Sequence, residues 1–174
     1  IPMVIADVHI GILYVLALTS IGVYAITFAG WCSGSTYSLL GGIRSSAQMI
    51  SYEISMGFSV GGVILLSESL RPMAIVESQS GWMWNALVQP IGFITFFVSA
   101  FAETNRLPFD LPEAEPELVG GYHTEYSSMK FAAFFLAEYA NMLIASTLIV
   151  TLYLGGWQIP YIETFGLPSG LVIA

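Results

Sequence analysis

Four long apolar stretches dominate the chain, and each is long enough to cross a bilayer as an α-helix, which takes about 20 residues. The first and third contain no charged residue, whereas the second contains Glu53 and the fourth contains Glu138. The period-two alternation of membrane β-strands is absent from these stretches. The sequence therefore predicts an all-α integral membrane protein, a single transmembrane domain over 1–174, with four transmembrane helices at about residues 10–31, 47–67, 82–102 and 131–153.

A long acidic loop, residues 103–130, is predicted between the third and fourth helices. Half of the chain's 12 acidic residues lie between Glu103 and Glu125. The first and third connections hold three basic residues and the second holds one (Arg44, Arg106 and Lys130 against Arg71). Because basic residues concentrate on the cytoplasmic side, the acidic loop is predicted to face the cytoplasm or its mitochondrial equivalent.

Glu53 and Glu138 each lie about two turns inside a predicted helix. A charged carboxylate in the membrane interior is costly unless it is paired or protonated. Glu53 has polar neighbours in sequence that are candidates to hydrogen-bond it (Gln48, Ser51, Tyr52 and Ser55). A protonated glutamate bonded to a facing helix is the structural alternative. The presence of two buried acids in four helices favours a function in a proton or substrate path.

The acidic loop combines clustered carboxylates with apolar side chains. Glu113, Glu115 and Glu117 occupy alternate positions, and like charges this close repel one another and titrate together. Prolines recur at every fourth position and prevent a long regular helix (Pro108, Pro112 and Pro116). A solvated loop is one interpretation. Its apolar residues favour a loop folded against a membrane-facing surface of this chain or of a partner (Phe109, Leu111, Leu118, Val119 and Tyr122).

The composition excludes several classes of protein. Hydrophobic residues make up 56% and charged residues 9% of the chain, with a mean hydropathy of +0.76, whereas a soluble domain is about a quarter charged. Four Lys plus Arg and a net charge of −8 argue against nucleic-acid binding. The single Cys32 excludes an internal disulfide and an iron–sulfur cluster held by this chain alone. His123 and Glu125 lack the Glu-x-x-His spacing of di-iron bundles, which argues against a metal site.

Several motifs, in order along the chain, resemble one family. They are Gly11-Ile-Leu-Tyr14, Ala29-Gly-Trp31, Tyr37-Ser-Leu-Leu-Gly41, Arg44-Ser-x-Ala-Gln48-x-Ile-Ser-Tyr-Glu53, Ala102-Glu-Thr-Asn-Arg-x-Pro-Phe-Asp110, Glu113-x-Glu115-x-Glu117-Leu-Val, Glu125-Tyr126-Ser and Ala137-Glu138-Tyr139. Together they resemble the quinone-site membrane subunit of respiratory complex I, the H subunit of bacterial NADH–quinone oxidoreductase. The resemblance covers nearly the whole chain and is weakest after Glu68. It implies an internal fragment that holds the third to the sixth spans of that family.

The resemblance also implies the function, that of a subunit of a proton-pumping NADH:quinone oxidoreductase, a translocase. Glu53, Glu103 and Glu138 would be proton-coupling carboxylates that lead from the quinone cavity towards antiporter-like subunits. The residues implied at the quinone cavity are those of the acidic loop (Arg106, Phe109, Asp110, Glu113, Glu115, Glu117, Glu125 and Tyr126).

The same resemblance implies the cofactors and partners. Quinone would be the substrate, and this chain would bind no redox cofactor, because FMN and the iron–sulfur clusters would belong to partner subunits. The implied partners are the peripheral-arm iron–sulfur subunits at the acidic loop, the small and antiporter-like membrane subunits, and the lipid bilayer. The implied location is a bacterial inner membrane, crossed several times, rather than the mitochondrial inner membrane.

Two other functions are compatible with parts of the pattern. The related membrane subunit of a nickel–iron hydrogenase or formate hydrogenlyase would keep the acidic loop but deliver electrons to protons. The intact Glu113-x-Glu115-x-Glu117 and Asn105-Arg-x-Pro-Phe109 motifs favour the quinone enzyme. A carboxylate-lined ion transporter would place its site at the bilayer midplane, whereas the acids of this chain gather at one face.

Overall fold

The computed structural model describes residues 7–79, 83–105, 108–109 and 121–158. Within these ranges the regular elements are helical: α1 Gly11–Cys32, α2 Thr36–Ser67, α3 Pro72–Ser78, α4 Asn85–Val88, α5 Pro90–Glu103, the 3-10 helix η1 Gly121–His123, and α7 Ser128–Tyr153. This agrees with the prediction of an all-α protein.

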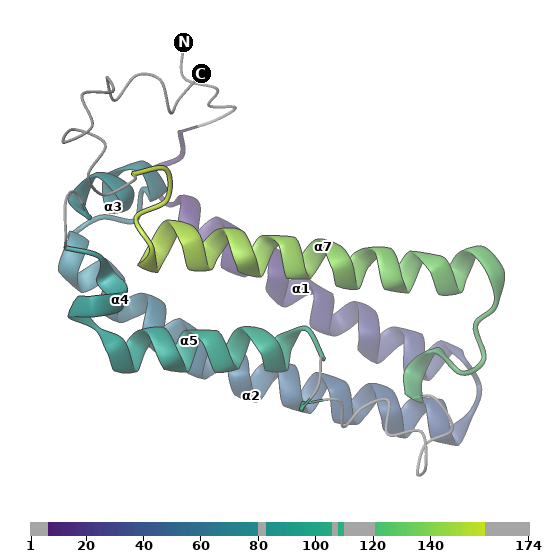
Figure 1. The fold of residues 1–174 in the computed structure, drawn as a ribbon. Coiled ribbons are helices and arrows are strands. Elements are labelled where there is room, and N and C mark those ends of the chain that lie inside the picture. The colour runs from purple at the N-terminus through teal and green to yellow at the C-terminus, as the bar shows by residue number, and fades with distance from the viewer. Residues whose placement is uncertain (1–6, 80–82, 106–107, 110–120, 159–174) are drawn as a thin grey trace.

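The long helices lie lengthwise beside one another (Figure 1). α2 packs against α1 on one side and against α5 on the other, and α7 contacts α3, α4 and α5. The end of α1, the start of α2, the end of α5 and the start of α7 lie at the same end of the molecule, while α3 and α4 lie at the opposite end. Among the described residues, α1, α2 and α7 are long and apolar enough to cross a membrane.

α2 begins earlier than the sequence pattern predicts. The expected connection over residues 32–46 is a short turn at 33–35, and Thr36 already starts one continuous helix of 32 residues. The polar and small residues that suggested a loop allow close packing in this helix. A Cβ on Gly30 of α1 would lie 2.9 Å from the backbone oxygen of Ser38, and 3.2 Å from the Cα of Gly42. Such close approach is typical of small residues between membrane helices.

The third apolar stretch, predicted as one helix over 82–102, is interrupted. α4 ends at Val88 and α5 starts at Pro90, with Gln89 between them at φ −127° and ψ 67°. Proline has no N–H to donate and fits the first position of a helix better than its interior. α5 is therefore 14 residues long, about 21 Å at 1.5 Å per residue, and shorter than a full span.

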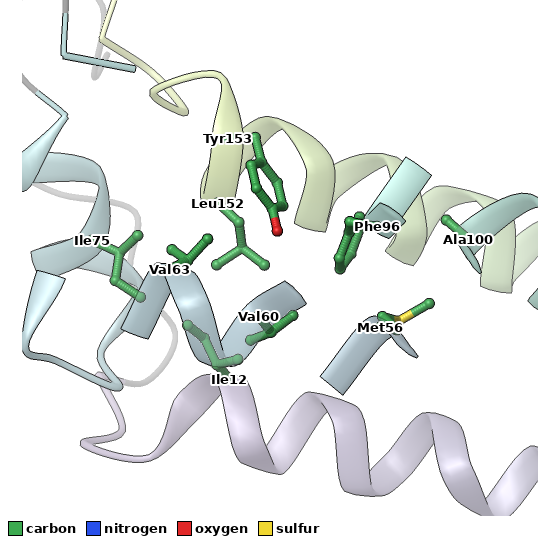
Figure 2. Packing of buried hydrophobic residues seen from close by; sticks show 9 residues of the cluster. All are labelled: Ile12, Met56, Val60, Val63, Ile75, Phe96, Ala100, Leu152 and Tyr153. Atoms are coloured by element: carbon green, nitrogen blue, oxygen red, sulfur yellow. The ribbon is translucent and has the colours of Figure 1, made fainter. Parts of the chain in front are cut away.

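The hydrophobic core lies between α1, α2, α3, α5 and α7 (Figure 2). Its buried members are Ile12, Met56, Val60, Val63, Ile75, Phe96, Ala100, Leu152 and Tyr153. The hydroxyl of Tyr153 lies 2.7 Å from Ser59 Oγ, so the buried polar end of this ring has a partner. Between membrane helices, such packing and hydrogen bonding replace the hydrophobic effect as the source of association.

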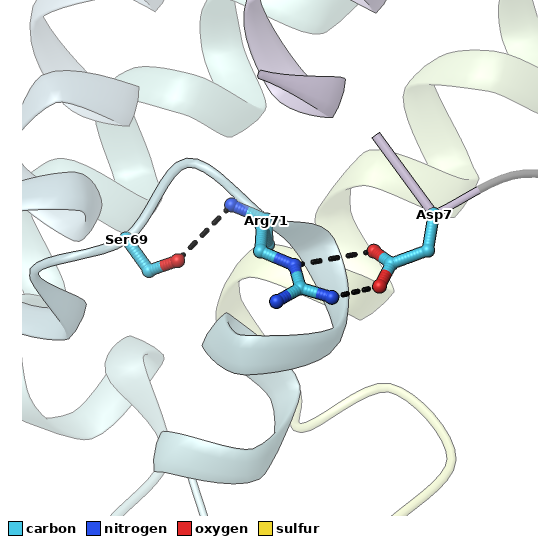
Figure 3. Close-up of polar contacts among 3 residues, drawn as sticks. All are labelled: Asp7, Ser69 and Arg71. Atoms are coloured by element: carbon cyan, nitrogen blue, oxygen red, sulfur yellow. Dashed lines mark hydrogen bonds and ion pairs between the residues drawn. The ribbon is translucent and has the colours of Figure 1, made fainter. Parts of the chain in front are cut away.

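An ion pair between Asp7 and Arg71 joins the segment before α1 to the start of α3 (Figure 3). The Arg71 backbone N–H also donates to Ser69 Oγ at 3.2 Å. Both charged side chains are partly exposed, so the pair orients two connections rather than contributing much stability. It lies far along the chain from the predicted acidic loop.

Candidate functional site

Glu53 lies on α2 at the interface with α1. The hydroxyl of Ser20 on α1 donates a hydrogen bond to the Glu53 carboxylate, and the same hydroxyl lies 2.9 Å from the Leu16 carbonyl oxygen. The sequence neighbours expected to bond Glu53 are directed elsewhere in two cases. Gln48 donates to the Ala102 and Phe109 carbonyls, and Ser51 donates to the Ala47 carbonyl. The partner of Glu53 therefore comes from a facing helix.

Glu103 is the last residue of α5 and is half-buried. Its carboxyl interacts electrostatically with Glu53 across the α2–α5 interface. Because like charges at short range repel, the state in which both carboxyls are ionised is disfavoured. The two side chains therefore form a coupled pair, in which the protonation of one affects the other.

A cavity of about 100 Å³ separates Glu103 from Glu138 of α7. It is lined by residues of α1, α2, the end of α5, η1 and α7: Gly22, Ala25, Ile26, Met49, Glu103, Thr104, Asn105, Tyr122, Phe134, Ala137, Glu138 and Asn141. A cavity of this volume with polar groups in its wall has room for a few water molecules. Water in this position would connect the two carboxyls through hydrogen bonds.

A second, much smaller cavity of about 10 Å³ shares Glu103, Thr104 and Asn141 with the first. Its other lining residues are Thr19, Met56, Phe96, Ile144, Ala145 and Leu148. Glu103 thus lies at the centre of the arrangement: it faces Glu53 on one side and the wall shared with Glu138 on the other. Three carboxyls from three helices form a series that is suited to proton transfer.

Both ends of the predicted acidic loop are attached to α2 and α1. At the start, Gln48 donates to the Phe109 carbonyl at 2.8 Å, and the ring of Tyr52 meets that of Phe109 edge-on at 5.4 Å. At the end, Ser38 Oγ donates to the Tyr122 carbonyl at 2.7 Å. The Tyr126 hydroxyl donates to the Ala29 carbonyl at 2.8 Å. The loop is therefore held at the end of the bundle near Glu103.

Glu125 and Tyr126, two residues predicted at a quinone cavity, line an open pocket of about 450 Å³ beside the ends of α1 and α7. The pocket also contains Cys32, Ser33, Ser127, Ser128, Met129 and Lys130. The other predicted loop residues, Arg106, Asp110, Glu113, Glu115 and Glu117, lie outside the described residues.

Comparison with known proteins identifies the family. A family model described as NADH dehydrogenase matches residues 1–174. The chain belongs to the NADH dehydrogenase family. It is 63% identical over 163 residues to NADH-quinone oxidoreductase subunit 8 of Rhodothermus marinus, a match that covers 91% of this chain and 48% of that protein.

Two further relatives are named as H subunits of NADH-quinone oxidoreductase. The protein of Salinibacter ruber is 60% identical over 162 residues, covering 91% of this chain and 47% of the relative. The first of the H-type proteins of Cytophaga hutchinsonii is 51% identical over 172 residues, covering 99% of this chain and 50% of the relative. The chain thus spans about half the length of the curated relatives it matches. The predicted resemblance to the H subunit of complex I is confirmed.

A metal site finds no support in the described part of the chain, where no group of three or more His, Cys, Asp or Glu side chains could hold a metal ion. His123, one residue weighed for such a site, has aromatic neighbours. Its ring centroid lies 5.1 Å from that of Tyr122 and 5.4 Å from that of Phe131. This environment suits packing of the ring more than metal coordination.

Sequence reasoning missed Ser20 as the partner of Glu53. A single hydroxyl in a charge-free helix carries no signal of its own, because Ser residues of membrane helices commonly bond their own backbone. Thr104 was also missed. Its hydroxyl bonds the Ala100 and Phe101 carbonyls at 3.1 Å each, and it lines both cavities beside Glu103. Its position directly after Glu103 is the signal that could have identified it.

Proposed function

We propose that this chain is part of the membrane subunit of a proton-pumping NADH:quinone oxidoreductase, and that it couples quinone reduction to proton translocation. The observation that carries the proposal is the arrangement around Glu103, with Glu53 on one side and the cavity leading to Glu138 on the other. Membership of the NADH dehydrogenase family supports it. The proton-coupling residues are Glu53, Glu103 and Glu138, with Ser20 bonding the first.

The chemistry of the substrate explains why carboxylates are needed. Reduction of a quinone to a quinol consumes two electrons and two protons (quinone + 2 e⁻ + 2 H⁺ → quinol), and oxidation of NADH to NAD⁺ and H⁺ supplies the two electrons. The charge beside the quinone therefore changes during each turnover. A neighbouring group of acids, Asp110, Glu113, Glu115 and Glu117, with Arg106 as counter-charge, responds by changing its protonation or position.

The ends of the acidic loop connect this response to the carboxyl series. Phe109, at the start of the loop, contacts Gln48 and Tyr52 on the helix that carries Glu53. Tyr122, at its end, bonds Ser38 and lines the cavity between Glu103 and Glu138. A change of the loop between two states would therefore alter the environment of all three carboxyls. In this way quinone reduction would bias proton transfer through them.

The proposal includes the surroundings of the chain. The acidic loop would face peripheral-arm subunits that carry FMN and iron–sulfur clusters, and the Glu138 side would lead towards small and antiporter-like membrane subunits. α4 and α5 together would supply a fourth membrane crossing beside α1, α2 and α7. The location would be a bacterial inner membrane, consistent with the three long apolar helices and the bacterial relatives.

The test uses membranes from cells that carry the full-length parent protein, compared with cells in which Glu115 and Glu117 are both changed to Gln. NADH-driven quinone reduction is measured beside NADH oxidation by an artificial electron acceptor, which reports only on the peripheral arm. Loss of the first with the second intact is the expected result. Unchanged quinone reduction would contradict a place at the quinone cavity and would favour the hydrogenase-type relative.

A further inference from the structure

One face of α2 holds both ends of the acidic loop. The residues of this face follow one another at intervals of three or four positions, which places them in one row along the helix: Ser38, Gly41, Ser45, Gln48 and Tyr52. Three of the five make hydrogen bonds to the segments that flank the loop. Glu53 follows directly after the last of them.

Gln48 is the member of this row with the most contacts. Its Nε2 donates to the carbonyl of Ala102 at 2.9 Å and to that of Phe109 at 2.8 Å, and lies 3.4 Å from Oδ1 of Asn105. A carboxamide nitrogen has two hydrogens, so the two short contacts use its full donor capacity. The Ala102 carbonyl belongs to the last turn of α5, where backbone acceptors have no partner within the helix. Gln48 therefore ties the end of α5 and the start of the loop to α2.

Asn105 makes the turn that separates α5 from the loop. It has a left-handed backbone at φ +49°, a conformation that Asn adopts more readily than most residues. Its side chain is buried, at 8% exposure, and its Nδ2 donates to Ser45 Oγ at 3.1 Å. The strained turn is thus stabilised by the same α2 face.

The positions of these contacts along the chain matter. Ala102 precedes Glu103 directly, and Asn105 follows Glu103 after one residue. The Gln48 side chain therefore contacts the backbone or side chains on both sides of Glu103. It also belongs to the helix that carries Glu53, with which Glu103 interacts electrostatically. The distance between the two carboxyls is set by this attachment.

We propose that Gln48 and Asn105 are positioning residues, which fix Glu103 relative to Glu53 and transmit displacement of the acidic loop to this pair. The inference rests on the proposed function. When the loop moves at Phe109, the bond from Gln48 to that carbonyl is strained or lost, and the bond from the same amide to Ala102 changes with it. The end of α5 then shifts relative to α2, and the interaction between the two carboxyls changes.

The test is made on the assembled complex that contains the full-length parent protein. Gln48→Met keeps the length of the side chain but removes its donors. Its matched control is Gln89→Met, because Gln89 donates to the Gly62 carbonyl at 3.0 Å and so also joins the α5 side to α2, but away from the loop. Asn105→Gly is the second variant, since glycine accepts the positive φ while removing the side-chain bonds.

The expected result is a fall of about three- to tenfold in NADH-driven quinone reduction for Gln48→Met, with a displaced pH profile and intact oxidation of NADH by an artificial acceptor. Asn105→Gly is expected to change the pH profile in the same direction. Gln89→Met is expected to leave the pH profile unchanged. In a background of Glu103→Gln, Gln48→Met should have little further effect, because both act through the same carboxyl.

The inference is overturned by an unchanged pH profile in Gln48→Met, or by effects of Gln48→Met and Glu103→Gln that multiply independently. Loss of assembly in both Gln48→Met and Asn105→Gly would assign the two residues a structural role only. If Glu103→Gln alone changes neither pumping nor quinone reduction, the proposed function fails together with this inference. If Glu103→Gln reduces pumping and Gln48→Met does not, only the positioning role is wrong.

Discussion

Ser20 on α1 donates a hydrogen bond to the carboxylate of Glu53 on α2. A carboxylate at a helix interface is stabilised in its charged form by such a donor, and removal of the donor leaves a desolvated acceptor. Ser20 therefore contributes to the proton affinity of the first member of the proposed series.

Ser20→Ala tests this contribution. We expect NADH-driven quinone reduction and the accompanying proton pumping to fall by about three- to tenfold, as follows from the loss of one hydrogen bond to a charged group. Ser20→Thr keeps the hydroxyl and is expected to restore most of the activity. Thr27→Val is the control, since the Thr27 hydroxyl on the same helix bonds only its own backbone at Val23 among the contacts described. Equal activity in Ser20→Ala and Thr27→Val would contradict a role for the Ser20–Glu53 bond.

Gly22 gives access to the cavity between Glu103 and Glu138. It lines this cavity, and a Cβ added there meets no atom within 4 Å. Gly22→Ala is expected to have a small effect and Gly22→Leu a large one on proton pumping, because the larger side chain displaces water from the cavity. Gly57→Leu is the control, since Gly57 also has open space around its Cβ position but lies away from the cavity. Pumping that does not depend on side-chain size at Gly22 would argue against a water-filled connection.

Gly41 tests the attachment of the end of the acidic loop. A Cβ at Gly41 would lie 2.9 Å from the backbone of both Gly121 and Tyr122, too close for either backbone to remain in place. We expect Gly41→Ala to displace η1 from α2 and to raise the KM for quinone, while oxidation of NADH by an artificial acceptor is retained. The matched substitution Gly61→Ala, on the same helix with no atom within 4 Å, should leave the KM unchanged. An unaltered KM in Gly41→Ala would show that the position of η1 does not matter for quinone binding.

Tyr153 and Ser59 form a buried pair whose role is expected to be structural. Tyr153→Phe leaves Ser59 without its partner at 2.7 Å and is expected to destabilise the folded subunit by about 1 kcal/mol. The double change of Tyr153→Phe with Ser59→Ala should cost less than the sum of the single changes. Thermal unfolding of the purified complex provides the measurement. The ratio of protons pumped to electrons transferred should stay constant, and a changed ratio would mean that the pair belongs to the proton path.

The sequence predicted the membrane helices from their composition but not their breaks and extensions. α1 and α7 agree closely with apolar stretches, since nothing inside them opposes a helix. Pro90 was visible within the third stretch, and its effect on the helix was underestimated. The start of α2 could not be predicted because its polar and small residues resemble a loop. They form a helix because Gly30 and Gly42 allow α1 and α2 to approach closely.

The same limit applies to the candidate site. Glu53 and Glu138 were identified because a carboxylate within an apolar stretch is rare and costly. Their partners could not be identified, since the sequence does not show which helix faces meet. Ser20 lies opposite Glu53, and Gln48 contacts the end of α5 instead of Glu53, only because α2 packs between α1 and α5. The placement of Glu113, Glu115 and Glu117 stays a prediction, because these residues lie outside the described ranges.

The most direct test of the proposed coupling is the number of protons pumped per electron in membrane vesicles that oxidise NADH with quinone. Glu103→Gln and Glu138→Gln are compared with Glu77→Gln, a change at an exposed carboxylate on α3. We expect pumping to fall at least about tenfold in the first two variants, because amides cannot exchange protons, and to remain unchanged in the third. Parental pumping in both Glu103→Gln and Glu138→Gln would contradict the proposal that these carboxyls carry the coupling.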